Sequence, residues 1–221
     1  MRMDDYLESI NTGQFQSNTT LEDQHVLMFS FGISPGFILG GSGKLGTETL
    51  PLPPFWPREN RERYFLEACR SSHIAIARFA IEHPEIKVII KSKWDRYWKE
   101  GVIEFLESDK IFIDDVPNLS FISTGNVHAL IKASRVVIGY GSTAMLEAAI
   151  AGKAVILPKF SEFVEKKFQN VILYPDLHDC FEIAESAEDL KTKIYEKWLN
   201  PSTTTFKMER RRWAFEKYVS A

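Results

Sequence analysis

The segment Arg135–Pro158 constrains the fold more than any other part of this 221-residue chain. It reads as an apolar strand, a glycine turn, a short apolar helix and a second apolar strand. This order is typical of two parallel strands joined by a crossover helix. Gly139 and Gly141 allow a sharp backbone turn where the first strand ends, and Ser142 and Thr143 follow where the helix begins. Backbone N–H groups at a helix N-terminus attract anions, so the segment predicts a phosphate site.

Glu147 is a carboxylate on an otherwise apolar helix. It follows Thr143 by four residues, so both side chains lie on one helix face. A buried carboxylate without partners is costly, and its oxygens suit the two hydroxyls of a ribose. A simpler interpretation also stays open, in which Ser142 and Thr143 only cap the helix and Glu147 faces solvent. Glycine turns before helices are common to all doubly wound folds.

The rest of the chain alternates between strand and helix patterns. Strands are predicted over residues 26–31, 86–90, 119–123, 135–139, 154–157 and 171–174, and helices over 59–82, 94–108, 127–133, 143–151, 187–198 and 204–219. Asn126 is a suitable N-cap for the helix over 127–133. The alternation predicts an α/β, Rossmann-like parallel sheet with helices on both faces. We expect a lead-in over 1–24, one domain over 25–200 and a C-terminal helix over 201–221. The Gly- and Pro-rich stretch 32–57 is predicted to be a functional loop or a mobile flap.

Composition and charge narrow the class of protein. The formal net charge of −3 argues against bulk binding to nucleic acid. No apolar run approaches the ~20 residues of a membrane span, and the start lacks a signal-peptide pattern. The sequence therefore predicts a cytoplasmic protein, with peripheral attachment at the inner face of the plasma membrane left open. The five histidines and two cysteines show no metal-ligand spacing, so neither a metal nor a cofactor is expected.

The Arg135–Pro158 segment resembles the C-terminal domain of two-domain, GT-B-type glycosyltransferases of bacterial surface-carbohydrate and capsule biosynthesis. It is more distantly similar to CDP-glycerol glycerophosphotransferases and UDP-GlcNAc 2-epimerases. The residues that match the shared pattern are Ser134, Arg135, Gly139, Ser142, Thr143, Glu147, Ala148, Gly152 and Lys153. Ala154 departs from it, since these families usually have proline there. The resemblance implies one half of a GT-B fold.

The resemblance also implies roles for particular residues. The turn at Gly141, Ser142 and Thr143 would meet the phosphates of a nucleotide-activated sugar, and Glu147 would bind the ribose. His128 lies on the helix that precedes this motif in the family, near the expected site.

Three further candidates follow other predicted strands. Lys91 and Lys93 come after the strand over 86–90, where the related families often carry a Lys-x-His-Pro element whose lysine approaches the donor phosphates. Here the sequence is Lys-Ser-Lys-Trp, so one lysine is predicted to contact phosphate, and a solvated charge is the alternative. Ser30 follows the first strand and would face the second domain.

The opening Arg2-Met3-Asp4 resembles the element that links the two domains in these families. We therefore expect a fragment that binds the donor and is inactive without an N-terminal domain. That missing domain would bind a glycan or lipid-linked acceptor, and the catalytic residues are unknown. The alternatives are a CDP-polyol phosphotransferase, a UDP-sugar epimerase-like domain, and a non-catalytic scaffold domain with the same fold.

Overall fold

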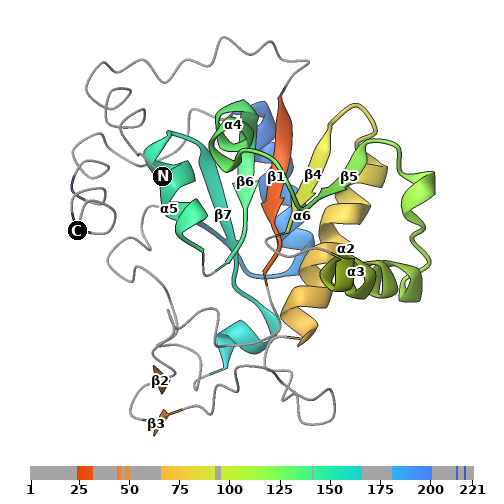
Figure 1. The fold of residues 1–221 in the computed structure, drawn as a ribbon, viewed down its shortest axis with the longest axis horizontal. Helices are drawn as coiled ribbons and strands as arrows, with labels where there is room; N and C mark the ends of the chain where they lie inside the picture. Colours follow the sequence, from red (N-terminus) through yellow and green to blue (C-terminus); the bar gives the residue numbers. More distant parts are fainter. Residues whose placement is uncertain are drawn as a thin grey trace.

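A parallel β-sheet runs through the centre of the computed structural model (Figure 1). The structure describes residues 24–31, 66–92, 96–140, 142–165 and 181–200, together with 44–45, 48–49, 213 and 217. Within these, six strands pair in the order β5-β4-β1-β6-β7-β8. Their bounds are β1 His25–Phe29, β4 Val88–Lys91, β5 Leu119–Ile122, β6 Ser134–Ile138, β7 Ala154–Pro158 and β8 Glu182–Ala184. A separate short antiparallel pair joins β2 Lys44–Leu45 to β3 Glu48–Thr49.

Helices cover both faces of the sheet. They are α2 Leu66–Glu82, α3 Arg96–Ser108, α4 Val127–Ala133, α5 Thr143–Ile150 and α6 Ala187–Leu199, with two short 3-10 helices, η4 Ile113–Asp115 and η5 Ser161–Val164. The core on one face is built with α2, α3 and α6, and that on the other with α4 and α5. Every residue of β1 is buried, which is typical of a parallel strand covered on both faces. The predicted fold class is therefore confirmed.

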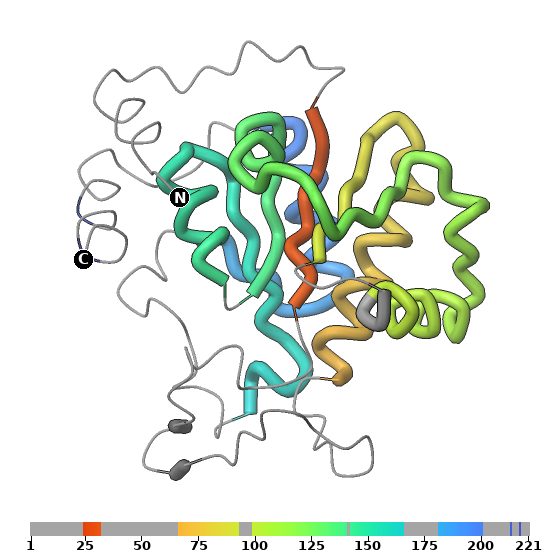
Figure 2. The backbone as a smooth tube through the Cα atoms, viewed as in Figure 1, coloured from red at the N-terminus to blue at the C-terminus, as the bar shows by residue number. Residues whose placement is uncertain are grey.

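The chain changes direction across the sheet between β1 and β6. From β1 it passes through α2 to β4 and then to β5, whereas from β6 it passes through α5 to β7 on the other side (Figure 2). β1 and β6 are hydrogen-bonded neighbours, with Met28 opposite Ile138. In open α/β sheets, ligands bind beyond the carboxyl ends of the strands at such a switch point. A ligand is therefore expected beside the residues that follow β1 and β6.

Most predicted elements lie within a few residues of the observed ones. The helix over 127–133 and its Asn126 cap are confirmed: Asn126 Oδ1 accepts hydrogen bonds from His128 N at 2.9 Å and Ala129 N at 3.2 Å. Strand β8 was not predicted, because it has three residues and only Ala184 is buried, so no apolar run marks it. The predictions for 1–23, 32–43, 171–174 and most of 201–221 lie outside the described residues. No helix in the described ranges is long and apolar enough to cross a membrane.

Candidate functional site

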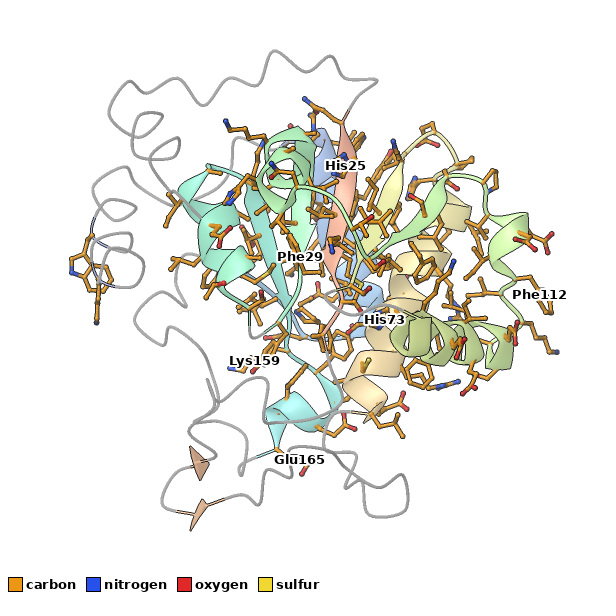
Figure 3. The ribbon with its side chains drawn as sticks, viewed as in Figure 1. His25, Phe29, His73, Phe112, Lys159 and Glu165 are labelled. Atoms are coloured by element: carbon orange, nitrogen blue, oxygen red, sulfur yellow. The ribbon has the colours of Figure 1, made fainter. Side chains whose placement is uncertain are left out.

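The residues that follow β1 and β6 meet at the carboxyl edge of the sheet. Phe31 and Tyr140 have ring centroids 6.3 Å apart, and Phe163 of η5 stacks on Tyr140 at 3.8 Å with the rings inclined by 18°. In Figure 3, His73 and Lys159 lie toward this edge, while His25 marks the opposite end of β1. Burial raises the pKa of Tyr140 to about 12, so its phenol stays neutral. These aromatic rings pack together at the switch point of the sheet.

Ser142 caps helix α5 at this edge, as the simpler interpretation of the sequence held. Ser142 has extended backbone angles, and its Oγ accepts a hydrogen bond from Ala144 N at 3.2 Å. The exposed Thr143 comes next, and its backbone N–H has no acceptor among the described residues. Gly141 lies outside them. A hydroxyl proton on Ser142 and the N–H of Thr143 are therefore donors that an anion at this helix end can use.

Gly139 lies in close packing under this turn. A Cβ atom there would lie 2.9 Å from both Sδ and Cε of Met145 and 3.2 Å from the carbonyl oxygen of Phe29. The absence of a side chain lets β6 approach β1 and α5 closely. It thereby brings the start of α5 to the edge of β1.

Glu147 faces α4 rather than bulk solvent. Its side chain is 17 % exposed, its Oε2 is buried without a hydrogen-bond partner, and Oε2 lies 3.7 Å from Nδ1 of His128. Burial raises the pKa of this carboxyl group. The interpretation that Glu147 points into solvent is therefore wrong. A half-buried carboxylate with an unused oxygen can receive hydroxyl donors from a ligand.

His128 stands beside Glu147 because Asn126 fixes the start of α4. The cap holds the first turn of α4, and His128 is its second residue, with a side chain 15 % exposed. At 3.7 Å the His128–Glu147 contact is too long for a hydrogen bond, and it becomes an ion pair only when His128 is protonated. The structure thus places His128 beside Glu147, one helix turn after Ser142 and Thr143 at the start of α5. That these residues bind a ligand stays a prediction.

Lys91 lies at the same edge, but its ammonium group contacts backbone carbonyls. Nζ donates to the carbonyl oxygen of Ser92 and, at 2.6 Å, to that of Ser123. The residue is 7 % exposed, and burial lowers its pKa. These bonds hold the ends of β4 and β5 together. The solvated-charge alternative is wrong for Lys91, and its contact with phosphate stays a prediction; Lys93 lies outside the described residues.

Ser30 follows β1 and contacts a buried histidine of α2. Its Oγ lies 2.7 Å from Nε2 of His73, and Nδ1 of His73 lies 2.6 Å from the carbonyl oxygen of Cys69. His73 is fully buried, and its pKa is lowered by that burial to about 4, so the imidazole is neutral. The sequence offered no signal for this contact, since 43 residues separate the two partners.

Two other residues of the motif, Arg135 and Lys153, make structural contacts away from this edge. Arg135 donates to Gln24 Oε1 and to the Leu199 carbonyl oxygen, both at 3.2 Å, and so ties the end of α6 to the start of β1. Lys153 donates through Nζ to the Lys132 carbonyl oxygen at 2.6 Å and satisfies the C-terminus of α4. Neither residue belongs to the candidate site.

The N-terminus of α2 is occupied by a carboxylate from the chain itself. Glu162 of η5 accepts hydrogen bonds from Glu67 N and Ala68 N, each at 2.7 Å. Helix α4 is likewise capped by Asn126, through two N–H groups. The first N–H groups of α2 are therefore already satisfied within the chain. Sequence reasoning missed Glu162, because its partners are more than 90 residues away.

Replacing Glu162 by glutamine should destabilise the protein. The glutamine side chain would keep one acceptor oxygen but lose the charge that interacts with the helix dipole. We expect the free energy of unfolding to fall by about 1 kcal/mol, as measured by urea denaturation. Glu104→Gln, on the exposed face of α3, is the control and should change it by less than about 0.5 kcal/mol. Equal stability of the two variants would contradict the capping role.

Metal ligands are not grouped in the part of the chain that the structure describes. Among those residues, no cluster of three or more histidine, cysteine, aspartate or glutamate side chains could hold an ion.

The chain is similar to known proteins in structure, but no similarity in sequence was found. No family model matches the sequence, and a comparison with curated proteins gives no match. A protein described as a UDP-N-acetylglucosamine 2-epimerase from Listeria monocytogenes superimposes with a TM-score of 0.48 at 9% identity, over 91% of this chain and 44% of that one. The UDP-GlcNAc 2-epimerase from Neisseria meningitidis, solved with UDP-GlcNAc bound, gives 0.46 at 12% identity, over 97% and 48%. The wall teichoic acid polymerase TagF gives 0.43 at 13% identity, over 98% and 43%. The chain thus spans less than half the length of each of these proteins.

Proposed function

We propose that this chain binds the nucleotide of a nucleotide-activated sugar at the carboxyl edge of β1 and β6. In this proposal the diphosphate lies at the N-terminus of α5, and the ribose hydroxyls donate to Glu147. The observation that carries the proposal is the buried, unpartnered Oε2 of Glu147. Burying a carboxylate oxygen without a hydrogen-bond partner costs free energy. A residue with only a structural role would have no reason to carry that cost.

The position of the site supports the same proposal. The donors at Ser142 and Thr143 lie one helix turn from Glu147, which suits a phosphate and a ribose joined in one ligand. The site also lies at the switch point of the sheet, where ligands bind in open α/β folds. The N-termini of α2 and α4 are already capped by Glu162 and Asn126.

The proposal extends from nucleotide binding to the glycosyl transfer that such binding would serve. A glycosyltransferase of this kind needs a second domain that binds the glycan or lipid-linked acceptor, and this chain would supply the donor half. As the leaving diphosphate gains charge, the α5 N-terminus and the Ser142 hydroxyl would stabilise it. We infer that the chain alone binds nucleotide and does not turn it over.

A thermal-shift panel tests the proposal. We expect one of CMP, CDP, UDP and GDP to stabilise the 221-residue chain. At about a hundred times its dissociation constant, that ligand should raise the melting temperature by roughly 5 to 10 °C. The matching nucleoside, which lacks phosphates, should give a much smaller shift.

The panel also separates the competing functions. A response to CDP above UDP would favour a CDP-polyol phosphotransferase over a UDP-sugar enzyme. The scaffold alternative expects no response to any of the four nucleotides, and that result would overturn the proposed function.

A further inference from the structure

Lys159 is a half-buried lysine whose ammonium group has no partner in the part of the chain that the structure describes. It follows β7 directly and lies between the buried residues of that strand and the buried Phe160. No described residue forms a hydrogen bond or an ion pair with its Nζ. The other described lysines that are not exposed each donate to an oxygen atom of the chain: Lys91, Lys153, Lys191, Lys193 and Lys197. Among these partly or fully buried lysines, Lys159 is therefore the one whose charge is available to a ligand.

The alternation of side chains along β7 places Lys159 on the face of the sheet that α5 covers. Successive side chains of a strand point to opposite faces. Phe160 belongs to the core on the α2 side, whereas Leu157 belongs to the core on the α5 side, together with Met145 from the first turn of α5. Lys159 N donates to the Ala184 carbonyl oxygen at 2.7 Å, so the ladder with β8 continues through Lys159. Its side chain therefore leaves the strand on the same face as that of Leu157.

The strand pairing brings the end of β7 next to the start of α5. Gly139 N, just after β6, donates to the carbonyl oxygen of Ile156 in β7 at 3.3 Å. Ser142 lies three residues beyond Gly139, and Lys159 lies three residues beyond Ile156. The flexible four-carbon stem of a lysine can cross the ~5 Å between neighbouring strands. The ammonium group of Lys159 can thus reach the space at the N-terminus of α5.

The segments that follow β6 and β7 stay together beyond the sheet. The rings of Tyr140 and Phe163 stack with centroids 3.8 Å apart. Figure 3 shows Lys159 at this carboxyl edge, at the end of the sheet opposite to His25. A crossover helix packs back onto the strands that it joins, so α5 starts above the ends of β6 and β7, beside Lys159.

A lysine in this position suits the second phosphate of a diphosphate. In the proposed function the ribose lies at Glu147, and the phosphate next to it lies at the α5 N-terminus. The second phosphate then lies farther from the helix end, and the effect of the helix dipole falls off within the first turn. A compact ammonium charge with three N–H donors can neutralise that phosphate.

We propose that Lys159 binds the phosphate farther from the nucleoside, and so makes the site selective for nucleoside diphosphates and their sugar or polyol esters over nucleoside monophosphates. This inference rests on the proposed nucleotide site and names a further binding residue in it.

Calorimetry with paired nucleotides tests the inference. The affinities of the 221-residue chain for UMP and UDP, and for CMP and CDP, are measured side by side. We expect wild type to bind the diphosphate of the preferred base about tenfold more tightly than the monophosphate. Lys159→Gln should weaken binding of the diphosphate by about tenfold and leave the affinity for the monophosphate within about threefold. Lys159→Arg keeps the charge and should retain most of the preference for the diphosphate.

Lys87→Gln is the matched control for the loss of one positive charge. Lys87 is exposed just before β4, at the opposite edge of the sheet. Its replacement should leave both affinities within about twofold, because surface charges separated by more than about 10 Å are screened by salt. A melting curve of each unliganded variant shows that it is folded before the affinities are compared.

The outcomes distinguish this inference from the function beneath it. Absence of binding by the wild-type chain to all four nucleotides overturns the proposed function. If the wild-type chain binds but Lys159→Gln weakens the monophosphate and the diphosphate equally, or neither, the inference about Lys159 is overturned and the nucleotide site stands. The same holds if Lys159→Arg loses the preference for the diphosphate as completely as Lys159→Gln does.

Discussion

Replacing Glu147 by glutamine should lower the affinity for nucleotide by about tenfold to a hundredfold. The glutamine side chain has nearly the same shape, but it lacks the negative charge that strengthens a hydrogen bond from a ribose hydroxyl. The measurement is calorimetric titration with whichever nucleotide gives the largest thermal shift. The loss should be much smaller for inorganic diphosphate, which has no ribose.

The same substitution should make the unliganded protein more stable at neutral pH. Burial raises the pKa of Glu147, so the folded protein holds this proton more tightly than the unfolded chain does. The contribution of the group to stability is therefore fully present below the unfolded pKa of about 4.3 and is lost as pH rises through the raised folded value. Glu147→Gln avoids that loss, so we expect a gain of about 1 kcal/mol near pH 7 and none below about pH 4.

Glu104→Gln controls for the removal of one negative charge. Glu104 is exposed on α3, and its replacement should leave nucleotide affinity unchanged. A Glu147→Gln variant that is more stable and still binds nucleotide as tightly as wild type would show that the carboxylate is buried for another reason. The ribose assignment would then be wrong.

Replacing Phe163 by alanine should reduce the free energy of unfolding by about 3 to 5 kcal/mol. The side chain is 1 % exposed, and it packs against Tyr140 and, with ring centroids 5.8 Å apart, against Phe31. Its loss leaves a cavity between the residues that follow β1, β6 and β7. It also loosens η5, which carries the Glu162 cap of α2. Urea denaturation measures the loss.

Two further measurements link Phe163 to the site. The pKa of Tyr140, raised to about 12 by burial, should fall toward its ordinary value in Phe163→Ala, and spectrophotometric titration against wild type detects this. Nucleotide affinity of the folded protein should fall as well. Phe79→Ala removes an equally buried ring from α2 and should cost similar stability without changing either property. If both variants behaved alike, Phe163 would be an ordinary core residue.

Local patterns were sufficient for the fold class and for the motif around α5. The apolar runs of β1, β6 and β7 are buried on both faces, which a parallel sheet requires and which shows directly in the sequence. The caps Ser142 and Asn126 act within three residues of their own positions. Such features depend on neighbours along the chain, and the sequence alone therefore predicted them.

The partners of the charged and polar side chains were decided by the tertiary structure. A lysine after a strand looks the same in sequence whether it meets phosphate or, as Lys91 does, the carbonyl oxygens of Ser92 and Ser123. The contact of His73 with Ser30 depends on how α2 packs on β1.

Glu147 shows what the sequence and the tertiary structure each determined. The sequence placed it one turn after Thr143 on an apolar helix, because helical spacing is regular. Only the packing of α4 against α5 decided that it is buried beside His128 with an oxygen unused. Burial and hydrogen-bond partners depend on residues far apart in the chain, and the order of strands in the sheet brings those residues together.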